Sequence, residues 1–189
     1  MNYLMPAQAG AQLLSLIVFG TLARWYAVPW LRTHARADAL IALLWVHVFR
    51  YVALLIFSAQ HDGFPISDSG AMEIVLGDLG GAVIAFITIA LLRNRAGFAI
   101  PLAWLLIAET GYDTVANIRG GVHEHLMGAA SGVTWLVLSF FVPMVVVSGV
   151  LLIWQLYARR GEALAPARND IRSREASVVR VSRQLGWTE

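Results

Sequence analysis

Five apolar runs, each about as long as a membrane-crossing helix, constrain this chain more than any other feature. A helix needs about 20 apolar residues to cross the hydrocarbon core of a bilayer. Of the 189 residues, 58% are hydrophobic and 14% are charged, whereas soluble domains carry about 25% charged residues. The runs cover residues 9–31, 38–60, 71–92, 97–118 and 129–157. We therefore expect an all-α membrane protein, a bundle of about five transmembrane helices.

The placement of arginine predicts how the bundle is oriented. All 14 basic residues are arginine, and pairs of them follow the first and third runs and the fifth run: Arg32, Arg36, Arg93, Arg95, Arg159 and Arg160. Because cytoplasmic loops are enriched in basic residues, the N-terminus is expected outside and the C-terminus in the cytoplasm. Residues 1–157 then form a five-helix transmembrane domain. Residues 158–189 form a basic cytoplasmic tail, either disordered or an interfacial helix, and the expected location is a bacterial inner (plasma) membrane.

Two absences exclude several kinds of chemistry. The chain has no cysteine, which excludes thiol exchange and thiolate-ligated iron–sulfur clusters. It also has no lysine, which excludes a retinal Schiff base. Only one histidine lies inside an apolar run, so haem held by two histidines is not expected. The arginines are explained by membrane orientation, and so they do not imply a nucleic-acid partner.

Arg50 lies near the middle of the second run, where a charged side chain costs roughly 2.5–3.5 kcal/mol on insertion scales. Such a residue needs polar partners. At 1.5 Å rise per residue, Glu109 lies at nearly the same depth on the fourth run. The other polar residues continue this ladder toward the outer face: Asp78, Asp113, Glu73 and Asn117. Whether Arg50 and Glu109 touch is left open by the sequence.

Helical periodicity places these residues on matching faces. His47 and Arg50 share one face of the second run, and Glu109, Asp113 and Asn117 share one stripe of the fourth. Gly77 and Gly81, beside Asp78, have the small-xxx-small spacing that predicts close helix packing. His47 is either a proton relay between the ladder and the cytoplasm or a hydrogen-bonded core residue.

Four carboxylates against one arginine leave a net charge of −3 if all of them ionise. A low-dielectric site does not tolerate that charge, so carboxyl groups are protonated, or a cation binds, or water enters. The structural alternative is an Arg50–Glu109 pair, with hydrogen-bonded Asp78 and Asp113, that fixes helix register.

The outer loops offer a second cluster, made of histidine and acidic residues. His123 and His125 are two residues apart, and His61 and Asp62 lie in the other outer loop. Imidazole and carboxylate ligands suit zinc or manganese, so a divalent metal site is one interpretation and a solvated loop is the other.

The fifth run has no charged residue and contains Pro143. We expect a bend near the proline, and we expect the helix to face lipid or a second subunit.

Three functions remain open. The first is a membrane protein that binds, and transports or senses, a proton, metal ion or cationic small molecule through an acidic pocket open to the outer face. The second is a membrane enzyme that acts on a lipid or isoprenoid substrate by carboxylate and histidine acid–base or metal chemistry. The third is a structural membrane subunit or assembly factor. The expected partners are the lipid bilayer, a second copy of the chain, and a membrane or cytoplasmic protein bound through the tail.

Overall fold

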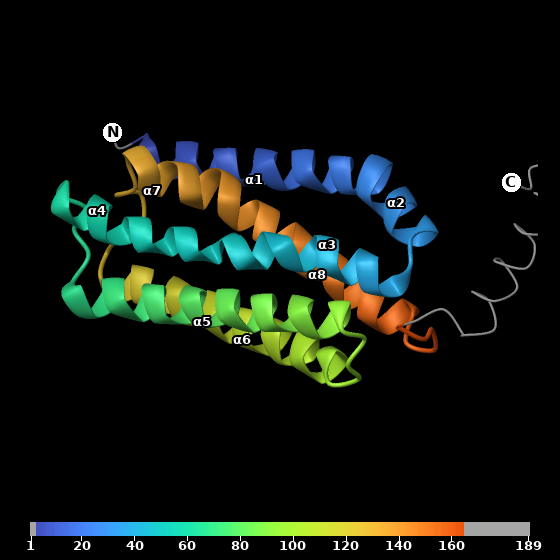
Figure 1. The fold of residues 1–189 in the computed structure, drawn as a ribbon. Coiled ribbons are helices and arrows are strands. Elements are labelled where there is room, and N and C mark those ends of the chain that lie inside the picture. The colour runs from blue at the N-terminus through green and yellow to red at the C-terminus, as the bar shows by residue number, and fades with distance from the viewer. Residues whose placement is uncertain (1–2, 165–189) are drawn as a thin grey trace, which may run out of the picture.

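The computed structural model describes residues 3–164, and in that part of the chain every regular element is helical. Five long helical segments follow one another, and each runs antiparallel to the one before it (Figure 1). Four of them are long and apolar enough to cross a membrane: Leu4–Thr33, Arg36–His61, Asp68–Arg93 and Gly132–Ala158. The predicted tail at 158–189 lies largely outside the described residues.

The remaining long helix, α6 (Ala99–His123), has 25 residues but is not among these four candidate spans. Glu109, Asp113 and Arg119 interrupt its apolar sequence. The prediction of five spans is therefore confirmed for four helices by length and composition. The first predicted run was also too short, because the helix begins at Leu4 and ends at Thr33.

The chain passes back and forth between two ends of the bundle. The end that we call the tail end holds the turn at 34–35, the turn at 94–98 and the end of the last helix (Figure 1). The opposite end, the loop end, holds the start of the first helix and the two loops at 62–67 and 124–131.

Two of the long segments contain a π-helical turn just before a proline. The first segment consists of α1 (Leu4–Leu22), the π turn η1 (Ala23–Ala27) and α2 (Val28–Thr33), which begins next to Pro29. The last consists of α7 (Gly132–Leu136), the π turn η3 (Val137–Phe141) and α8 (Val142–Ala158), with Pro143 at its start. Proline lacks an N–H and collides with the carbonyl four residues earlier, and a wider turn relieves this collision. The irregularity expected at Pro143 takes this form.

The second segment changes its winding in the middle. Between α3 (Arg36–Val48) and α4 (Leu55–His61) lies η2 (Phe49–Leu54), a 3₁₀ turn. A stretch of 3₁₀ helix inside a long helix often marks a functional position or local strain. Arg50 is the only residue of this turn that is buried.

The third helix, α5 (Asp68–Arg93), packs against α3 and α6, and α8 packs against α3 and α1. The fifth apolar run was expected to face lipid or another subunit. One side of α8 is exposed, at Val146, Val150 and Ile153, and its other side packs inside the bundle. This helix buries Val145, Ser148, Leu152, Gln155 and Leu156, and the Ser148 hydroxyl donates to the Leu43 carbonyl of α3 at 3.0 Å. The helix on the periphery is α1, which buries no residue.

Candidate functional site

The side chain of Arg50 is 2% exposed, and each of its N–H groups has an acceptor. Nε donates to Asp78 Oδ1 at 2.8 Å. Nη1 donates to Glu109 Oε2 and to the Thr110 hydroxyl, both at 2.8 Å. Nη2 donates to Asp113 Oδ2 at 2.7 Å and to Glu109 Oε1 at 3.3 Å. Since a guanidinium has five N–H donors, this one has no donor left for a further ligand.

Three helical segments supply this polar cluster, which we define as Arg50, Asp78, Glu109, Thr110 and Asp113. Arg50 comes from the 3₁₀ turn η2, Asp78 from α5, and the other three residues from α6. Glu109 and Asp113 lie one helical turn apart on one face, so a single planar guanidinium contacts both. The Arg50–Glu109 contact, which the sequence left open, is therefore present.

Two glycines of α5 make room for these charged side chains. A Cβ on Gly81 would lie 2.6 Å from Cζ of Arg50 and 2.7 Å from Glu109 Oε2. A Cβ on Gly77 would lie 2.8 Å from Cγ of Asp113. Their spacing was predicted to serve helix packing alone. Instead, the polar side chains from the neighbouring helices occupy the space that the missing Cβ atoms leave.

The cluster has more negative than positive charge. Asp78, Glu109 and Asp113 face one arginine, which leaves a net charge of −2 if all three ionise. Their side chains are 22%, 20% and 10% exposed, against 2% for Arg50. The arginine is thus enclosed, while the three carboxyl groups are partly exposed at the surface of the described chain.

Two members of the predicted ladder lie at or beyond the edge of the cluster. Asn117 is half-buried and donates from Nδ2 to Asp113 Oδ2 at 3.2 Å, which extends the network by one turn toward the loop end. Glu73 is exposed on α5, and no ion pair joins it to the rest of the described chain. It therefore does not add to the charge around Arg50.

His47 is 1% exposed and lies one turn from Arg50, toward the tail end. Neither of its ring nitrogens has a hydrogen-bond partner within the described residues. Its Cε1 faces α8, where a Cβ on Gly149 would lie 3.9 Å away. One interpretation of His47 was a hydrogen-bonded core residue. The described residues instead leave its buried imidazole without a hydrogen-bond donor or acceptor.

The main apolar core lies on one side of the polar cluster. Its buried members all lie between the cluster and the tail end: Leu31, Ala39, Leu40, Leu43, Leu44, Ala85, Ile89, Leu92, Ala99, Ala103, Leu106, Leu152 and Leu156. On the loop-end side, α6 buries Asp113 but none of its apolar side chains beyond it. The buried apolar residues on this side are Ala59, Ile66, Ala71, Val75 and Ala130. The polar cluster thus lies between the main apolar core and a half of the bundle whose buried apolar side chains are mostly small.

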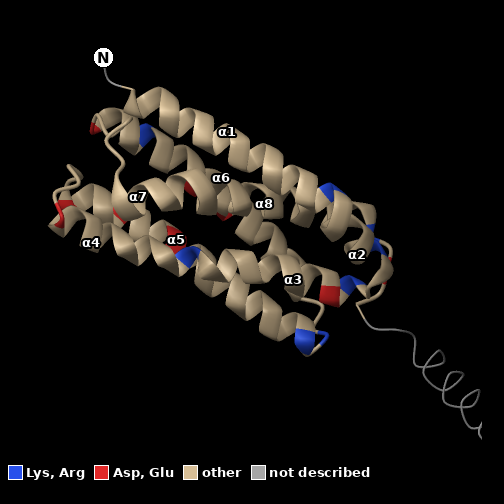
Figure 2. Cartoon of the chain, turned by 90° about the horizontal axis from the view of Figure 1, so that it is seen from above, with Lys and Arg blue, Asp and Glu red and all other residues tan. Residues whose placement is uncertain are grey.

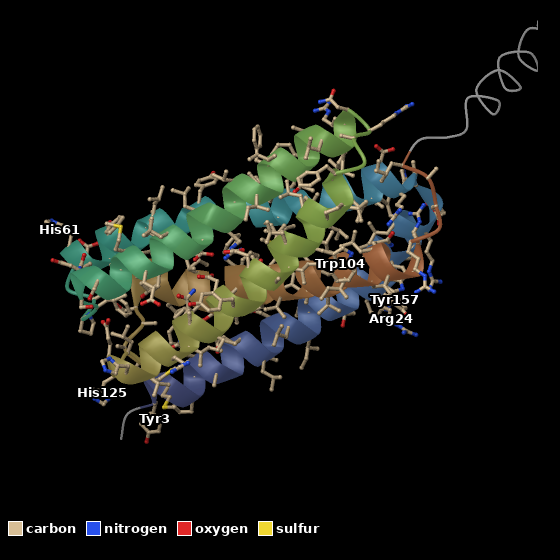
Figure 3. The ribbon with its side chains drawn as sticks, turned by 90° about the horizontal axis from the view of Figure 1, so that it is seen from below. Tyr3, Arg24, His61, Trp104, His125 and Tyr157 are labelled. Carbon is tan, nitrogen blue, oxygen red and sulfur yellow. The ribbon has the colours of Figure 1, made fainter. Side chains whose placement is uncertain are left out.

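The metal ligands suggested by the sequence do not gather into one site. His61, Asp62, His123 and His125 are all exposed. Figure 3 shows His61 at the end of α4 and His125 beside Tyr3, well apart at the loop end. Within residues 3–164, no group of three or more histidine and acidic side chains is placed to hold a metal ion.

A different residue of this loop connects the two outer loops. The Glu124 carboxylate accepts hydrogen bonds from the Ser67 backbone N–H at 2.8 Å and from the Ser67 hydroxyl at 2.7 Å. These bonds hold the pKa of Glu124 below its ordinary value. Ser67 in turn caps α5, because its Oγ accepts from the Gly70 N–H at 3.0 Å. Sequence reasoning missed Glu124 and Thr110. Thr110 had one signal, its position directly after Glu109.

These features define an all-helical bundle with four candidate membrane spans, built around one enclosed arginine and three carboxylates. The chain belongs to the family described as a domain of unknown function, DUF8737, whose model matches residues 8–157. No curated protein and no solved structure matches the chain.

Proposed function

We propose that this protein is embedded in a membrane and that its polar cluster binds a proton, with the carboxyl groups of Asp78, Glu109 and Asp113 as the acceptors. The observation that carries the proposal is the saturation of Arg50. One cation makes all its hydrogen bonds to a site with three carboxylates, so the excess negative charge has no partner in the described chain. In a low-dielectric surrounding, the addition of a proton lowers the cost of that charge.

The contacts of Arg50 favour a proton over an anionic ligand or a divalent metal ion. An anionic ligand group would need free guanidinium donors, and Arg50 has none. A divalent metal ion would need at least three convergent protein ligands in the usual case, whereas here the guanidinium lies between the carboxylates. A proton needs only one carboxylate oxygen, and it can be shared among the three acids.

We further propose that all five long helices cross the membrane, including α6. At 1.5 Å per residue its 25 residues extend about 37 Å, enough to cross the hydrocarbon core. Its acidic residues face the arginine of a neighbouring helix, as intramembrane charges do. We propose a bacterial inner membrane as the location of the protein.

The distribution of charge supports an orientation with the tail end in the cytoplasm. Figure 2 shows basic residues gathered where α2 meets α3 and at the turn between α5 and α6. At the loop end of the described chain, Arg119 is the one basic residue, and acidic residues lie around it in the sequence. Under the positive-inside rule, the loop-end half of the bundle then faces outward, and the main apolar core separates the cluster from the cytoplasm.

The experiment is infrared difference spectroscopy of the protein in lipid nanodiscs, in which the pH is lowered and the C=O stretch of protonated carboxylic acids is recorded. We expect this band to appear in the unaltered protein and to shrink in Asp113→Asn and in Glu109→Gln. Glu73→Gln is the matched control, because Glu73 lies on α5 outside the cluster, and it should leave the intramembrane band intact. If no band arises from Asp78, Glu109 or Asp113 across the pH range in which the protein stays folded, the proposal is wrong.

The complete satisfaction of Arg50 also favours a second candidate, a structural membrane subunit whose cluster fixes the order and rotation of three helices. In that case the carboxylates stay ionised at every pH that preserves the fold. The same infrared experiment separates the two, since only the first candidate gives a protonated-carboxyl band before unfolding.

A further inference from the structure

Arg159, at the end of α8, fastens the tail end of the bundle. Its Nη1 donates to the Leu31 carbonyl at 2.9 Å, and its Nη2 donates to the His34 carbonyl at 3.0 Å. Nε and Nη2 also donate to the Glu162 carboxylate. Arg159 therefore fixes the corner between α2 and α3 against the end of α8, and its donors are used in doing so.

Arg32 and Arg160 lie at the same end of the bundle and, unlike Arg159, contact aromatic rings. Cζ of Arg32 lies 5.6 Å from the ring centroid of Trp154, and Cζ of Arg160 lies 5.0 Å from that of Tyr157. Within residues 3–164, neither guanidinium forms a hydrogen bond or an ion pair. Each is placed over an aromatic ring by a cation–π contact, and its N–H edge remains free.

The two rings place both cations beside the same helix, α8. Trp154 and Tyr157 are three residues apart on α8, so they share one face of the helix with Cβ atoms roughly 5–6 Å apart. Tyr157 lies at the tail end in Figure 3. Below the rings, Val150 and Ile153 continue the same side of α8 and are 62% and 41% exposed. Two free guanidinium groups thus lie above an exposed apolar strip.

We propose that Arg32 and Arg160 bind the phosphate headgroup of an anionic phospholipid of the cytoplasmic leaflet, with an acyl chain along Val150 and Ile153. This inference rests on the membrane orientation proposed above. The charge is complementary, because the neighbouring Glu162 carboxylate is already bound to Arg159. Aromatic rings at the level of the headgroups are typical of membrane interfaces, and guanidinium binds phosphate through paired N–H donors.

The site would have a structural consequence. Arg32 belongs to α2 and Arg160 follows α8, so a single headgroup bound to both would link the first and last helical segments. The first segment has few buried residues, since α1 buries none and α2 buries only Leu31, so the headgroup would add to the bond that Arg159 already donates to the Leu31 carbonyl. Binding of the lipid is therefore expected to raise the melting temperature by holding this segment in place.

The test is a titration of the detergent-solubilised full chain with phosphatidylglycerol, followed by native mass spectrometry, with phosphatidylcholine as the zwitterionic comparison. The variant R32Q/R160Q should bind phosphatidylglycerol roughly thirtyfold more weakly, because each basic residue at an anionic lipid contributes roughly fivefold. The matched control is R93Q/R95Q, which removes two arginines from the same end of the bundle but from positions without an aromatic partner. It should weaken binding much less than R32Q/R160Q does, because no aromatic ring holds these two guanidinium groups over a binding position.

Three outcomes would overturn the proposal: equal losses in the two double variants, equal affinity for phosphatidylcholine, or displacement of the lipid by inorganic phosphate at similar concentration. R32K/R160K keeps the charge and should recover part of the affinity, which distinguishes binding from a folding defect. The infrared band of the polar cluster should be unchanged in R32Q/R160Q. A failure of lipid binding can therefore be told apart from a failure of the proton proposal.

Discussion

Arg50 lies directly over the backbone of Gly81, so that a Cβ at position 81 would fall 2.6 Å from Cζ of the arginine. The side chain is also held by three acids from two other helices, and it cannot swing away without the loss of several charge-assisted hydrogen bonds. The glycine and the charged cluster are therefore one feature of the structure. The close approach of α5 is what lets a single arginine reach Asp78 and the acids of α6.

This relationship predicts that Gly81→Ala destabilises the protein. We expect the free energy of unfolding to fall by about 1–3 kcal/mol, as for overpacking in other protein interiors, measured by chemical denaturation in detergent micelles. Gly80→Ala is the matched control, because a Cβ there meets nothing within 4 Å. It should be neutral or slightly stabilising, since alanine favours helix over glycine. Equal effects at both positions would show that Arg50 does not lie over Gly81.

Removal of the arginine should be far more damaging than removal of an acid. Arg50→Met leaves three carboxylates without a counter-charge and should cost about 3–5 kcal/mol of unfolding free energy near neutral pH. Protonation of the carboxylates removes their repulsion, so the loss should shrink as the pH falls. Unfolding of Arg50→Met measured at pH values from neutral to mildly acidic checks this, and a loss that stays constant with pH would contradict it.

The burial of His47 predicts a gain of stability when it is replaced. Both ring nitrogens lack partners in the described chain, and an unsatisfied buried polar group costs about 1–3 kcal/mol. His47→Leu should therefore be as stable as the unaltered protein or more stable, by up to about 2 kcal/mol. Thermal unfolding of the two proteins tests this. A loss of more than about 2 kcal/mol would mean that the imidazole has a strong partner.

The stabilisation from the Ser67–Glu124 hydrogen bonds, which join the two outer loops, should be lost in acid. Hydrogen bonds from Ser67 lower the pKa of Glu124 from its ordinary value of 4.5. The ionised form is favoured in the folded state, so its stabilisation is present above that ordinary value and is lost as the pH falls through the lowered pKa. The carboxylate is near solvent, which limits the contribution to about 1 kcal/mol or less.

The check is a double-mutant cycle of Glu124→Gln and Ser67→Ala, measured at neutral pH and again below pH 4. The coupling energy between the two positions should be present at neutral pH and absent in acid. A coupling energy that is the same at both pH values would show that the charge of Glu124 does not strengthen its hydrogen bonds with Ser67.

The sequence predicted the helical class and the depth of the cluster because both follow from one-dimensional patterns. Long apolar runs predict helices, and residue counts place Arg50 and Glu109 at one level. The rotation of the helices does not follow from such patterns. The involvement of Thr110 and the exposure of Glu73 therefore became visible only in three dimensions.

Two expectations differ from the structure, the first of them only in part, and each has its own physical reason. The absence of charge in the last run suggested a lipid-facing helix, yet α8 buries Ser148 and Gln155 against the rest of the bundle. Lipid and protein interiors are both apolar, so hydropathy alone does not separate the two surroundings. The histidines of the outer loops suggested a metal site, but loop residues have no periodicity that would place them relative to one another.

The most direct measurement of the central claim is the sidedness of protonation. The protein is reconstituted into liposomes, trypsin cleavage of the arginine-rich tail establishes its orientation, and the pH on each side is set independently while the carboxylic acid C=O band is recorded. We expect the band to appear when only the side of the loop end is acidified, and to be absent in Asp113→Asn but present in Glu73→Gln. A band that follows the pH on the side of the tail end, or no band from the cluster at all, would contradict an outward-facing proton site above an apolar core.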